Sequence, residues 1–174
     1  MTARWHVTAA GGLLLVGCAG CATGRRSVAE AFPPASVAAP WRLEGDVWSG
    51  TWDEAAPALG TDADVWRPCE PTRVWLAIYR HEDQPARTVT VRGFAFVSAD
   101  AARGAYDALR PLDAKRYEAG DAGCWTEVGV LFRWGRLVFD VFGQDASWGS
   151  QVQASLLAAY VTKRMPPGAP GDPQ

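Results

Sequence analysis

Residues that could act as catalysts are few in this sequence, and their spacing does not fit the common mechanisms. Beyond the N-terminal segment there is a single histidine, His81, in the polar run Arg80–Pro85. A Ser–His or Cys–His pair needs a histidine beside its nucleophile. No Gly-x-Ser-x-Gly, His-Glu-x-x-His or phosphate-binding glycine motif occurs. We therefore interpret His81 as a solvated loop residue.

Two adjacent carboxylate pairs, Asp53-Glu54 and Glu82-Asp83, are the candidates for a glycosidase mechanism. That mechanism needs two carboxyl groups about 5 to 10 Å apart across a cleft. Neighbours on one strand or helix point apart, so an envelope hydrolase of glycosidase type ranks lowest among the functions considered. Cys69 and Cys124 lack the paired spacing of a zinc site. We expect no enzyme activity, no metal and no cofactor.

Five residues are the candidate ligand contacts. Arg92 and Asp140 each lie in an otherwise apolar segment, where an unpaired buried charge is costly, so they pair with one another or meet a ligand. Trp66, Trp125 and Trp134 carry indole rings, which suit stacking on sugars or protein surfaces. We expect most tryptophans to lie in the core, with Trp125 and Trp134 the most exposed because they border turns.

The N-terminus has the layout of an export signal. A short segment with one fixed positive charge precedes the uncharged run Val7–Gly17. That run is too short for a bilayer span, which needs about 20 apolar residues. Leu15-Val16-Gly17-Cys18 resembles the lipobox of bacterial lipoproteins. The resemblance implies cleavage before Cys18 and a lipid on its thiol, with Cys21 as the alternative site and an ordinary secretory peptide as the rival interpretation.

The lipobox implies a location in the bacterial cell envelope, where the protein is exported and lipid-anchored, and we expect the outer membrane, facing the periplasm. Two or three acyl chains on one residue would hold it there stably. Unpaired cysteines in an oxidising compartment commonly join. We therefore expect a Cys69–Cys124 disulfide closing a loop of about 55 residues, with two separate buried thiols as the alternative.

The composition predicts one domain. The chain has 174 residues and a formal net charge of −2, which argues against a nucleic-acid partner. Residues 1–17 form the expected lipoprotein signal peptide. Residues 18–40 read as the lipidated cysteine and a flexible tether rich in Gly, Pro and Ala, and residues 166–174 as a disordered Pro/Gly tail. The folded domain is expected at 41–165.

Local patterns predict the elements of that domain. Alternating apolar residues over 74–79 and 88–97 indicate an antiparallel hairpin. A helix follows over 98–110, with Ser98 as its N-cap. Segments 123–132 and 136–142 form a second hairpin around Trp134-Gly135.

The two ends of the domain are harder to read. The Trp-rich segment 41–66 is expected to be irregular, with one or two helical turns that begin at a Thr51–Glu54 capping box. It is expected to cover part of the sheet face opposite the two helices. A last helix spans about 150–165, and its predicted buried stripe consists of Val152, Leu156, Ala159 and Tyr160.

This order predicts an α+β fold: an antiparallel sheet of about four to five strands with two helices packed on one face. The order resembles secreted bacterial domains of unknown function and, more distantly, the layout of PsbP-like and Mog1-like domains. The resemblance is carried by Ser98-Ala99-Asp100-Ala101-Ala102 after a strand and by the hairpin ending Leu137-Val138-Phe139. It implies no chemistry.

The sequence thus favours a lipid-anchored envelope protein with a non-catalytic binding or structural domain. Its expected partners are the membrane, through the N-terminal lipid, and an envelope protein or a cell-wall glycan. The alternative is a carbohydrate- or peptidoglycan-binding module that uses exposed tryptophans.

Overall fold

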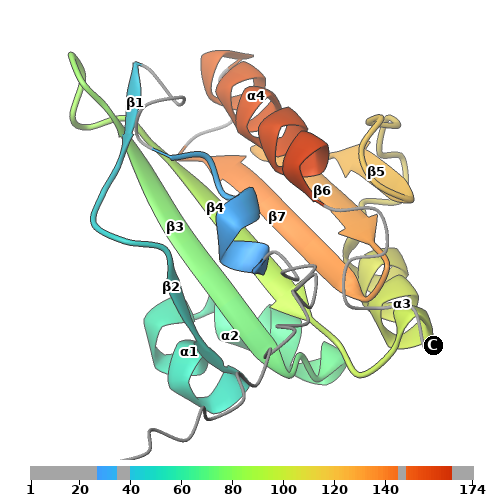
Figure 1. Cartoon of the computed structure of the whole chain (residues 1–174). Coiled ribbons are helices and arrows are strands. Elements are labelled where there is room, and N and C mark those ends of the chain that lie inside the picture. The colour runs from blue at the N-terminus through green and yellow to red at the C-terminus, as the bar shows by residue number, and fades with distance from the viewer. Residues whose placement is uncertain (1–26, 35–39, 145–147, 166–174) are drawn as a thin grey trace, which may run out of the picture.

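A seven-stranded antiparallel sheet with helices on both faces forms the protein, as a computed structural model describes it for residues 27–34, 40–144 and 148–165 (Figure 1). The strand order is β1-β3-β4-β7-β6-β5, and β2 also pairs with β3. The α+β class is confirmed. The sheet has more strands than predicted. The Trp-rich segment 41–66 contributes two strands, and the region predicted as one strand over 123–132 contributes two.

Most elements follow one another along the chain with short connections, and a longer one joins α3 to β5. The strands are β1 (Trp41–Leu43), β2 (Trp48–Thr51), β3 (Arg73–His81), β4 (Thr88–Ala95), β5 (Ala122–Trp125), β6 (Gly129–Trp134) and β7 (Leu137–Gly143). The helices are the 3-10 helices η1 (Val28–Ala31) and η2 (Arg67–Cys69) and the α-helices α1 (Trp52–Leu59), α2 (Asp62–Trp66), α3 (Ala99–Leu109) and α4 (Trp148–Arg164).

Two hairpins form the centre of the sheet. The predicted β3–β4 hairpin is confirmed, and β7 pairs with the other side of β4. Trp134 pairs with Leu137 across the β6–β7 turn, which leaves Gly135 and Arg136 as its two loop residues. Gly135 has a φ of 55°, a backbone conformation that glycine adopts without strain.

The β3 edge carries two short strands that the sequence did not reveal. β1 pairs with the end of β3 around His81, and β2 pairs with its beginning around Arg73. Strands of three and four residues are too short for an alternating pattern to stand out.

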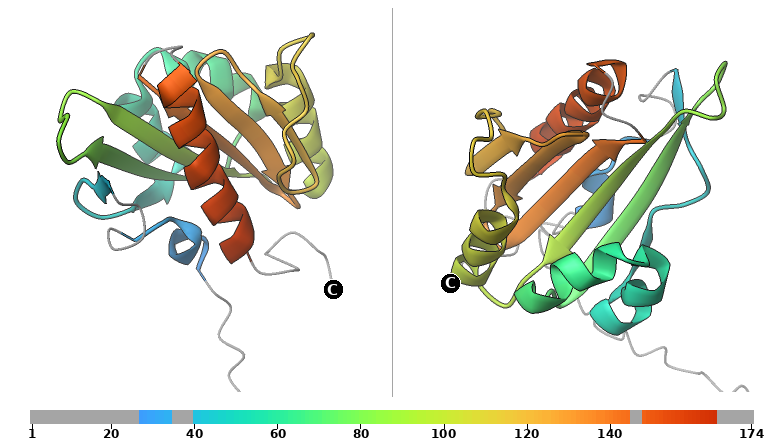
Figure 2. Two further views of the ribbon diagram at one scale, coloured as in Figure 1. Left: turned by 90° about the horizontal axis from the view of Figure 1, so that it is seen from above. Right: turned by 180° about the vertical axis from the view of Figure 1, so that it is seen from behind.

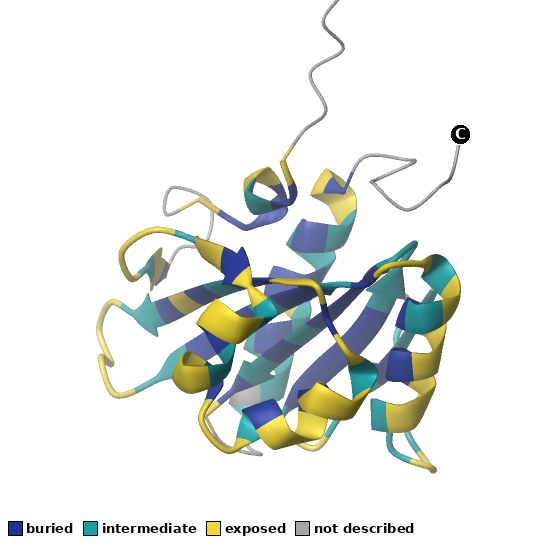
Figure 3. Cartoon of the chain, turned by 90° about the horizontal axis from the view of Figure 1, so that it is seen from below, coloured by how far each residue is buried: buried dark blue, intermediate teal, exposed yellow. Residues whose placement is uncertain are grey.

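Helices cover both faces of the sheet, so the predicted placement of two helices on one face is wrong. α4 packs with η1 over β4, β6 and β7, whereas α3 meets β6 and β7 from the opposite side together with α1 and α2 (Figure 2). Figure 3 shows buried sheet residues behind helices whose outer surfaces are exposed. The physical reason is that the central strands are apolar on both faces and need two covers.

Alternating residues of the central strands therefore enter two different cores. Val91, Phe139 and Val141 face α4, and Phe94 and Val138 face α3. All five side chains are buried.

The predicted buried stripe of the last helix is wrong at Leu156, which is 58% exposed. The other three predicted residues are half-buried. Among the α4 residues whose burial the structure describes, the buried ones are Ala154, Leu157, Ala158 and Val161. The two alanines among them let the helix lie close to the sheet.

The folded part of the chain begins before residue 41, inside the segment predicted as a tether. Val28, Ala31 and Phe32 are buried in the core beneath α4. The Tyr79 hydroxyl donates a buried hydrogen bond of 2.8 Å to the carbonyl of Pro33. The rest of the predicted tether, the predicted signal peptide and the predicted tail lie outside the described residues.

Two local helix signals in the sequence are confirmed, those at the starts of α1 and α3, whereas the last helix begins at Trp148, earlier than predicted. Thr51 and Glu54 form the capping box of α1, which continues through Pro57. The Ser98 hydroxyl accepts a hydrogen bond from the Ala101 N–H at the start of α3.

We predict that Phe32→Ala lowers the free energy of unfolding by about 3 to 5 kcal/mol, because it removes a buried aromatic ring from the core. Glu30→Ala, two residues earlier in η1, is the control, since that side chain is exposed; its effect is expected to stay within about 0.5 kcal/mol. Urea unfolding of both variants measures this. Equal effects would contradict the packing of residues 27–34 on the domain.

Candidate functional site

Arg92 and Asp140, two of the predicted site residues, lie side by side on adjacent strands. They are register partners on β4 and β7, on the sheet face that α1, α2 and α3 cover. Arg92 Nη1 is 3.9 Å from Asp140 Oδ2, and Arg92 Nη2 donates a 2.7 Å hydrogen bond to Asp62 of α2. The guanidinium also lies 4.4 Å from the centre of the Phe142 ring. The expected pairing of Arg92 with Asp140 is confirmed.

The arrangement favours a structural role for this cluster. The Arg92 and Asp140 side chains are only 12% and 19% exposed. Burial raises the pKa of Asp140 to about 6; Arg92 opposes that shift, and the Asp62 carboxylate adds to it. One arginine thus serves two carboxylates, and its closer bond ties α2 to the sheet. Little of its charge is left for a ligand.

The three predicted tryptophan contacts are less accessible than expected. Trp66 is buried and stacks on Phe94 at 3.6 Å between ring centres, so it is not a platform. Trp125 is half-buried and meets Tyr117 edge-on at 5.2 Å. Trp134 is also half-buried, beside Gly120. The prediction that Trp125 and Trp134 are the most exposed is wrong because the chain before β5 folds over both; Trp48, at 39%, is more exposed.

The predicted Cys69–Cys124 disulfide is not present in the structure, in which both side chains are free thiols. Cys124 is buried, and its thiol interacts with the Tyr106 hydroxyl of α3. Cys69 is half-buried at the margin of the same core. Burial raises the pKa of both thiols, which disfavours the reactive thiolate.

The paired carboxylates and His81 take part in local contacts. Glu54 belongs to the α1 capping box, and Glu82 forms an ion pair with Arg42. The His81 ring lies edge-on to Trp41 at 5.1 Å, and its Nδ1 accepts a hydrogen bond from the Asp83 N–H. Within the described residues, no three His, Cys, Asp or Glu side chains lie together as metal ligands would.

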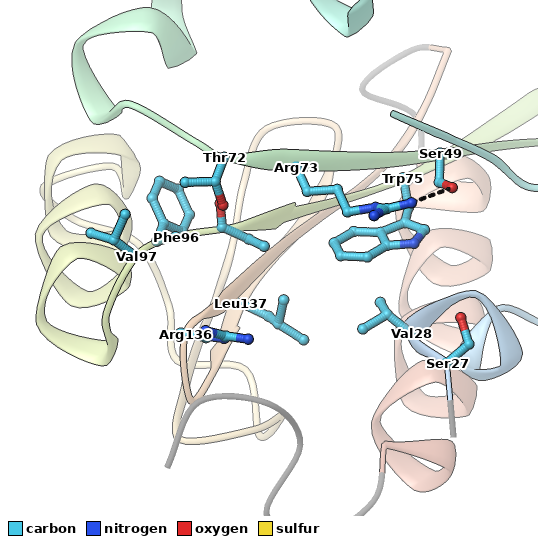
Figure 4. Close-up of a pocket in the computed structure, with 11 residues that line it drawn as sticks. Ser27, Val28, Ser49, Thr72, Arg73, Trp75, Phe96, Val97, Arg136 and Leu137 are labelled. Carbon is cyan, nitrogen blue, oxygen red and sulfur yellow. Dashed lines mark hydrogen bonds between the residues drawn. The ribbon is translucent and has the colours of Figure 1, made fainter. Parts of the chain in front are cut away.

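A cavity of about 720 Å³ lies where η1 approaches β2, the start of β3 and the β6–β7 turn (Figure 4). We call it the arginine cavity, after Arg73 and Arg136. Its other lining residues are the hydroxyl-bearing Ser27, Ser49 and Thr72 and the apolar Val28, Trp75, Ala95, Phe96, Val97 and Leu137. None of the described residues that line it is acidic.

Backbone hydrogen bonds fix the two arginines at the cavity. The Phe96 N–H donates to the carbonyl of Arg136 at 3.0 Å, which joins the β6–β7 turn to the end of β4. The Thr72 N–H donates to the carbonyl of Ala95 at 2.7 Å and holds the start of β3, where Arg73 lies. Both guanidinium groups are thus carried by the same end of the sheet.

The charges of these arginines are largely uncompensated. Arg73 reaches over the Trp75 ring, 5.7 Å from its centre, and donates a long hydrogen bond of 3.4 Å to Ser49 Oγ (Figure 4). Arg136 Nε is buried, and within the part of the chain that the structure describes it has no hydrogen-bond partner. Among the described residues, neither arginine has an acidic partner within 4 Å. Arg73 does act on the more distant carboxylate of Glu54. Hydrogen bonds from Thr51 lower the pKa of Glu54, and the positive charge of Arg73 lowers it further.

A second cavity of about 900 Å³ lies between α3, the residues before β5 and α4. It includes Trp134 together with charges of both signs: Asp107, Arg110, Arg116, Glu118 and Asp121. The balanced charge favours neither anions nor cations. Of the predicted ligand contacts, only Trp134 lines either cavity.

The arginine cavity was missed because its residues are far apart in the sequence. Arg73 is the first residue of β3, Arg136 lies in a turn, and the lining residues outside 72–75 and 136–137 come from three further segments, 27–28, 49 and 95–97. Arginines at strand ends are common on protein surfaces, so no local pattern marks these two.

Comparisons with known protein families, with characterised proteins and with solved structures give no significant match for this chain. Across residues 27–34, 40–144 and 148–165, none of the helices has the length and apolarity that a membrane span requires.

We predict that Asp140→Asn stabilises the protein relative to the parent chain as the pH rises. Because the folded pKa of Asp140 is raised to about 6, the protonated carboxyl favours the native state at low pH, and this contribution is lost as the pH rises through 6. The free energy of unfolding of the variant minus that of the parent should grow by about 1 to 3 kcal/mol between pH 4 and 8.

Urea unfolding at both pH values measures this difference. Asp113→Asn is the control, since that side chain is exposed and forms no ion pair in the described part of the chain. A difference that stays constant with pH for Asp140→Asn would contradict the prediction.

Proposed function

We propose that this protein is an exported, lipid-anchored envelope protein whose domain binds an anionic organic ligand in the arginine cavity. One observation carries the proposal: two arginines without acidic partners within 4 Å, among the described residues, line one cavity with apolar walls. We propose a non-catalytic role, because neither lining arginine is placed beside a nucleophile and a base.

The chemistry of the lining residues favours an anion. A guanidinium donates two parallel hydrogen bonds to a carboxylate or a phosphate, and such charge-assisted bonds are stronger than neutral ones. Trp75, Phe96 and Leu137 can cover the carbon part of the ligand, as in most small-molecule sites. A positive cavity in a chain of net charge −2 also draws anions to one place.

Anchoring through Cys18 rests on the Leu15-Val16-Gly17-Cys18 motif, which resembles a lipobox. The anchor would bind the protein to the membrane, and the domain would meet its partner in the envelope.

We expect the processed protein to begin at an acylated Cys18, as measured by mass spectrometry of its N-terminal peptide from a bacterial host. Cys18→Ala should abolish acylation and leave the protein out of the membrane fraction, whereas Cys21→Ala should retain both. Acylation of Cys21 alone would move the anchor by three residues, and an unacylated N-terminus would refute the anchoring.

A glycan-binding module is the second candidate, because the half-buried indole of Trp134 lines the second cavity. This candidate predicts that the protein binds cell-wall fragments. Trp134→Ala should abolish that binding, and substitution of Arg73 should leave it unchanged. The two functions are therefore distinguishable with the same protein.

We expect octyl phosphate and decanoate to change the tryptophan fluorescence of the protein, since Trp75 lines the cavity beside Arg73. Arg73→Gln and Arg136→Gln should each weaken binding about tenfold or more, the loss expected for one charge-assisted hydrogen bond.

Arg103→Gln removes an exposed arginine of α3 outside the cavity and is the matched control; it should leave the affinity within about twofold. Binding of neither anion, or equal effects of all three substitutions, would refute the proposed site.

A further inference from the structure

We infer that the arginine cavity takes the phosphate headgroup of an anionic membrane lipid, with the cavity end of the domain against the bilayer. The inference rests on the proposed function, whose ligand class it narrows from organic anions to phosphodiesters held in a membrane.

The position of the cavity along the chain is the first argument. Ser27 and Val28 line it, and they are nine and ten residues after Cys18. A chain spans at most about 3.3 to 3.6 Å per residue, so Ser27 lies within about 30 Å of a lipid on Cys18. The anchor therefore keeps this end of the domain near the membrane, where lipid headgroups are the most concentrated anions.

Hydrogen-bond donors at the cavity fit a phosphate better than a carboxylate. Besides the two guanidinium groups there are the hydroxyls of Ser27 and Ser49. In the described part of the chain each of these oxygens accepts a hydrogen bond, from Ala29 N–H and from Arg73, while its own O–H has no acceptor. The oxygens of a phosphodiester are arranged tetrahedrally around phosphorus and can accept from donors on different sides of a cavity, whereas the two oxygens of a carboxylate lie in one plane.

Apolar lining residues extend from the interior of the cavity to its rim. Trp75 and Leu137 are buried, whereas Val97 is 74% exposed. A lipid presents a charged headgroup followed directly by hydrocarbon, so its first carbons could contact this surface while the phosphate meets the arginines. Tryptophan is also suited to the boundary between apolar and polar layers.

The test uses the chain from residue 18 with Cys18→Ser and Cys21→Ser, which removes the lipid anchor. Both cores are built from residues 28–165, so this chain keeps the whole described fold. Its binding is measured by sedimentation with phosphatidylcholine vesicles that contain phosphatidylglycerol, and with vesicles of phosphatidylcholine alone. Soluble octyl phosphate and glycerol phosphate are titrated in parallel by tryptophan fluorescence.

We expect the protein to bind the phosphatidylglycerol vesicles. Arg73→Gln and Arg136→Gln should each weaken this binding about tenfold or more, and Arg103→Gln should leave the affinity within about twofold. General attraction to an anionic surface is worth about 1 kcal/mol for each basic residue, or about fivefold, and would not depend on the cavity. Arg73→Lys and Arg136→Lys keep the charge without the planar guanidinium and should still lose affinity. Octyl phosphate should displace the unsubstituted protein from the vesicles, a measurement that needs no folded variant.

Three outcomes would overturn the inference. Vesicle binding that the cavity substitutions and Arg103→Gln weaken equally would make the contact a non-specific one. Binding of soluble octyl phosphate, weakened by the cavity substitutions but without vesicle binding, would leave the proposed function standing and exclude a membrane lipid. Binding of neither soluble anions nor vesicles would refute both.

Discussion

The fold depends on a sheet whose central strands are apolar on both faces. Val91 and Val141 on one side, and Phe94 and Val138 on the other, must all be removed from water, and no single layer of helices can do this. α4 and η1 form one cover, and α1, α2 and α3 form the other. The folded start of the chain belongs to this double packing, because Val28, Ala31 and Phe32 are buried in the core on the α4 side.

Arg92 is the exception within the sheet, and its position explains how the shorter helices are held. A charge among buried strands is tolerated when it is paired. Asp140 lies next to it on β7, and Asp62, the first residue of α2, pairs with the same guanidinium. The cluster thus adds a charged link between α2 and the middle of the sheet to the apolar packing of Trp66 on Phe94. Arg73 and Arg136, at the end of the sheet, have no such neighbours among the described residues. The charge of Arg92 therefore stabilises the fold, whereas the charges of Arg73 and Arg136 can bind a ligand.

Sequence patterns predicted the features that a few neighbouring residues determine. The β3–β4 hairpin, the Ser98 N-cap and the Thr51–Glu54 capping box depend on alternation or on spacings of three residues. Features that depend on distant partners were missed. Which face of α4 is buried follows from the sheet beneath it, and the packing of Phe32 follows from β7, to which its ring lies close. The cavity combines positions 73 and 136, which only the order of the strands brings together. Trp66 shows the same limit: stacking on Phe94 explains its burial.

The hydrogen bond from Tyr79 to Pro33 has a mechanical consequence. Tyr79 lies on β3 and Phe32 contacts Phe139 on β7, so the first described segment is fastened to both halves of the sheet. Tension applied to the chain before residue 27 would therefore reach the interior of the domain directly, and would not be absorbed by a peripheral strand. A force that pulls the domain away from the chain before residue 27 would therefore act first on the contacts beneath α4.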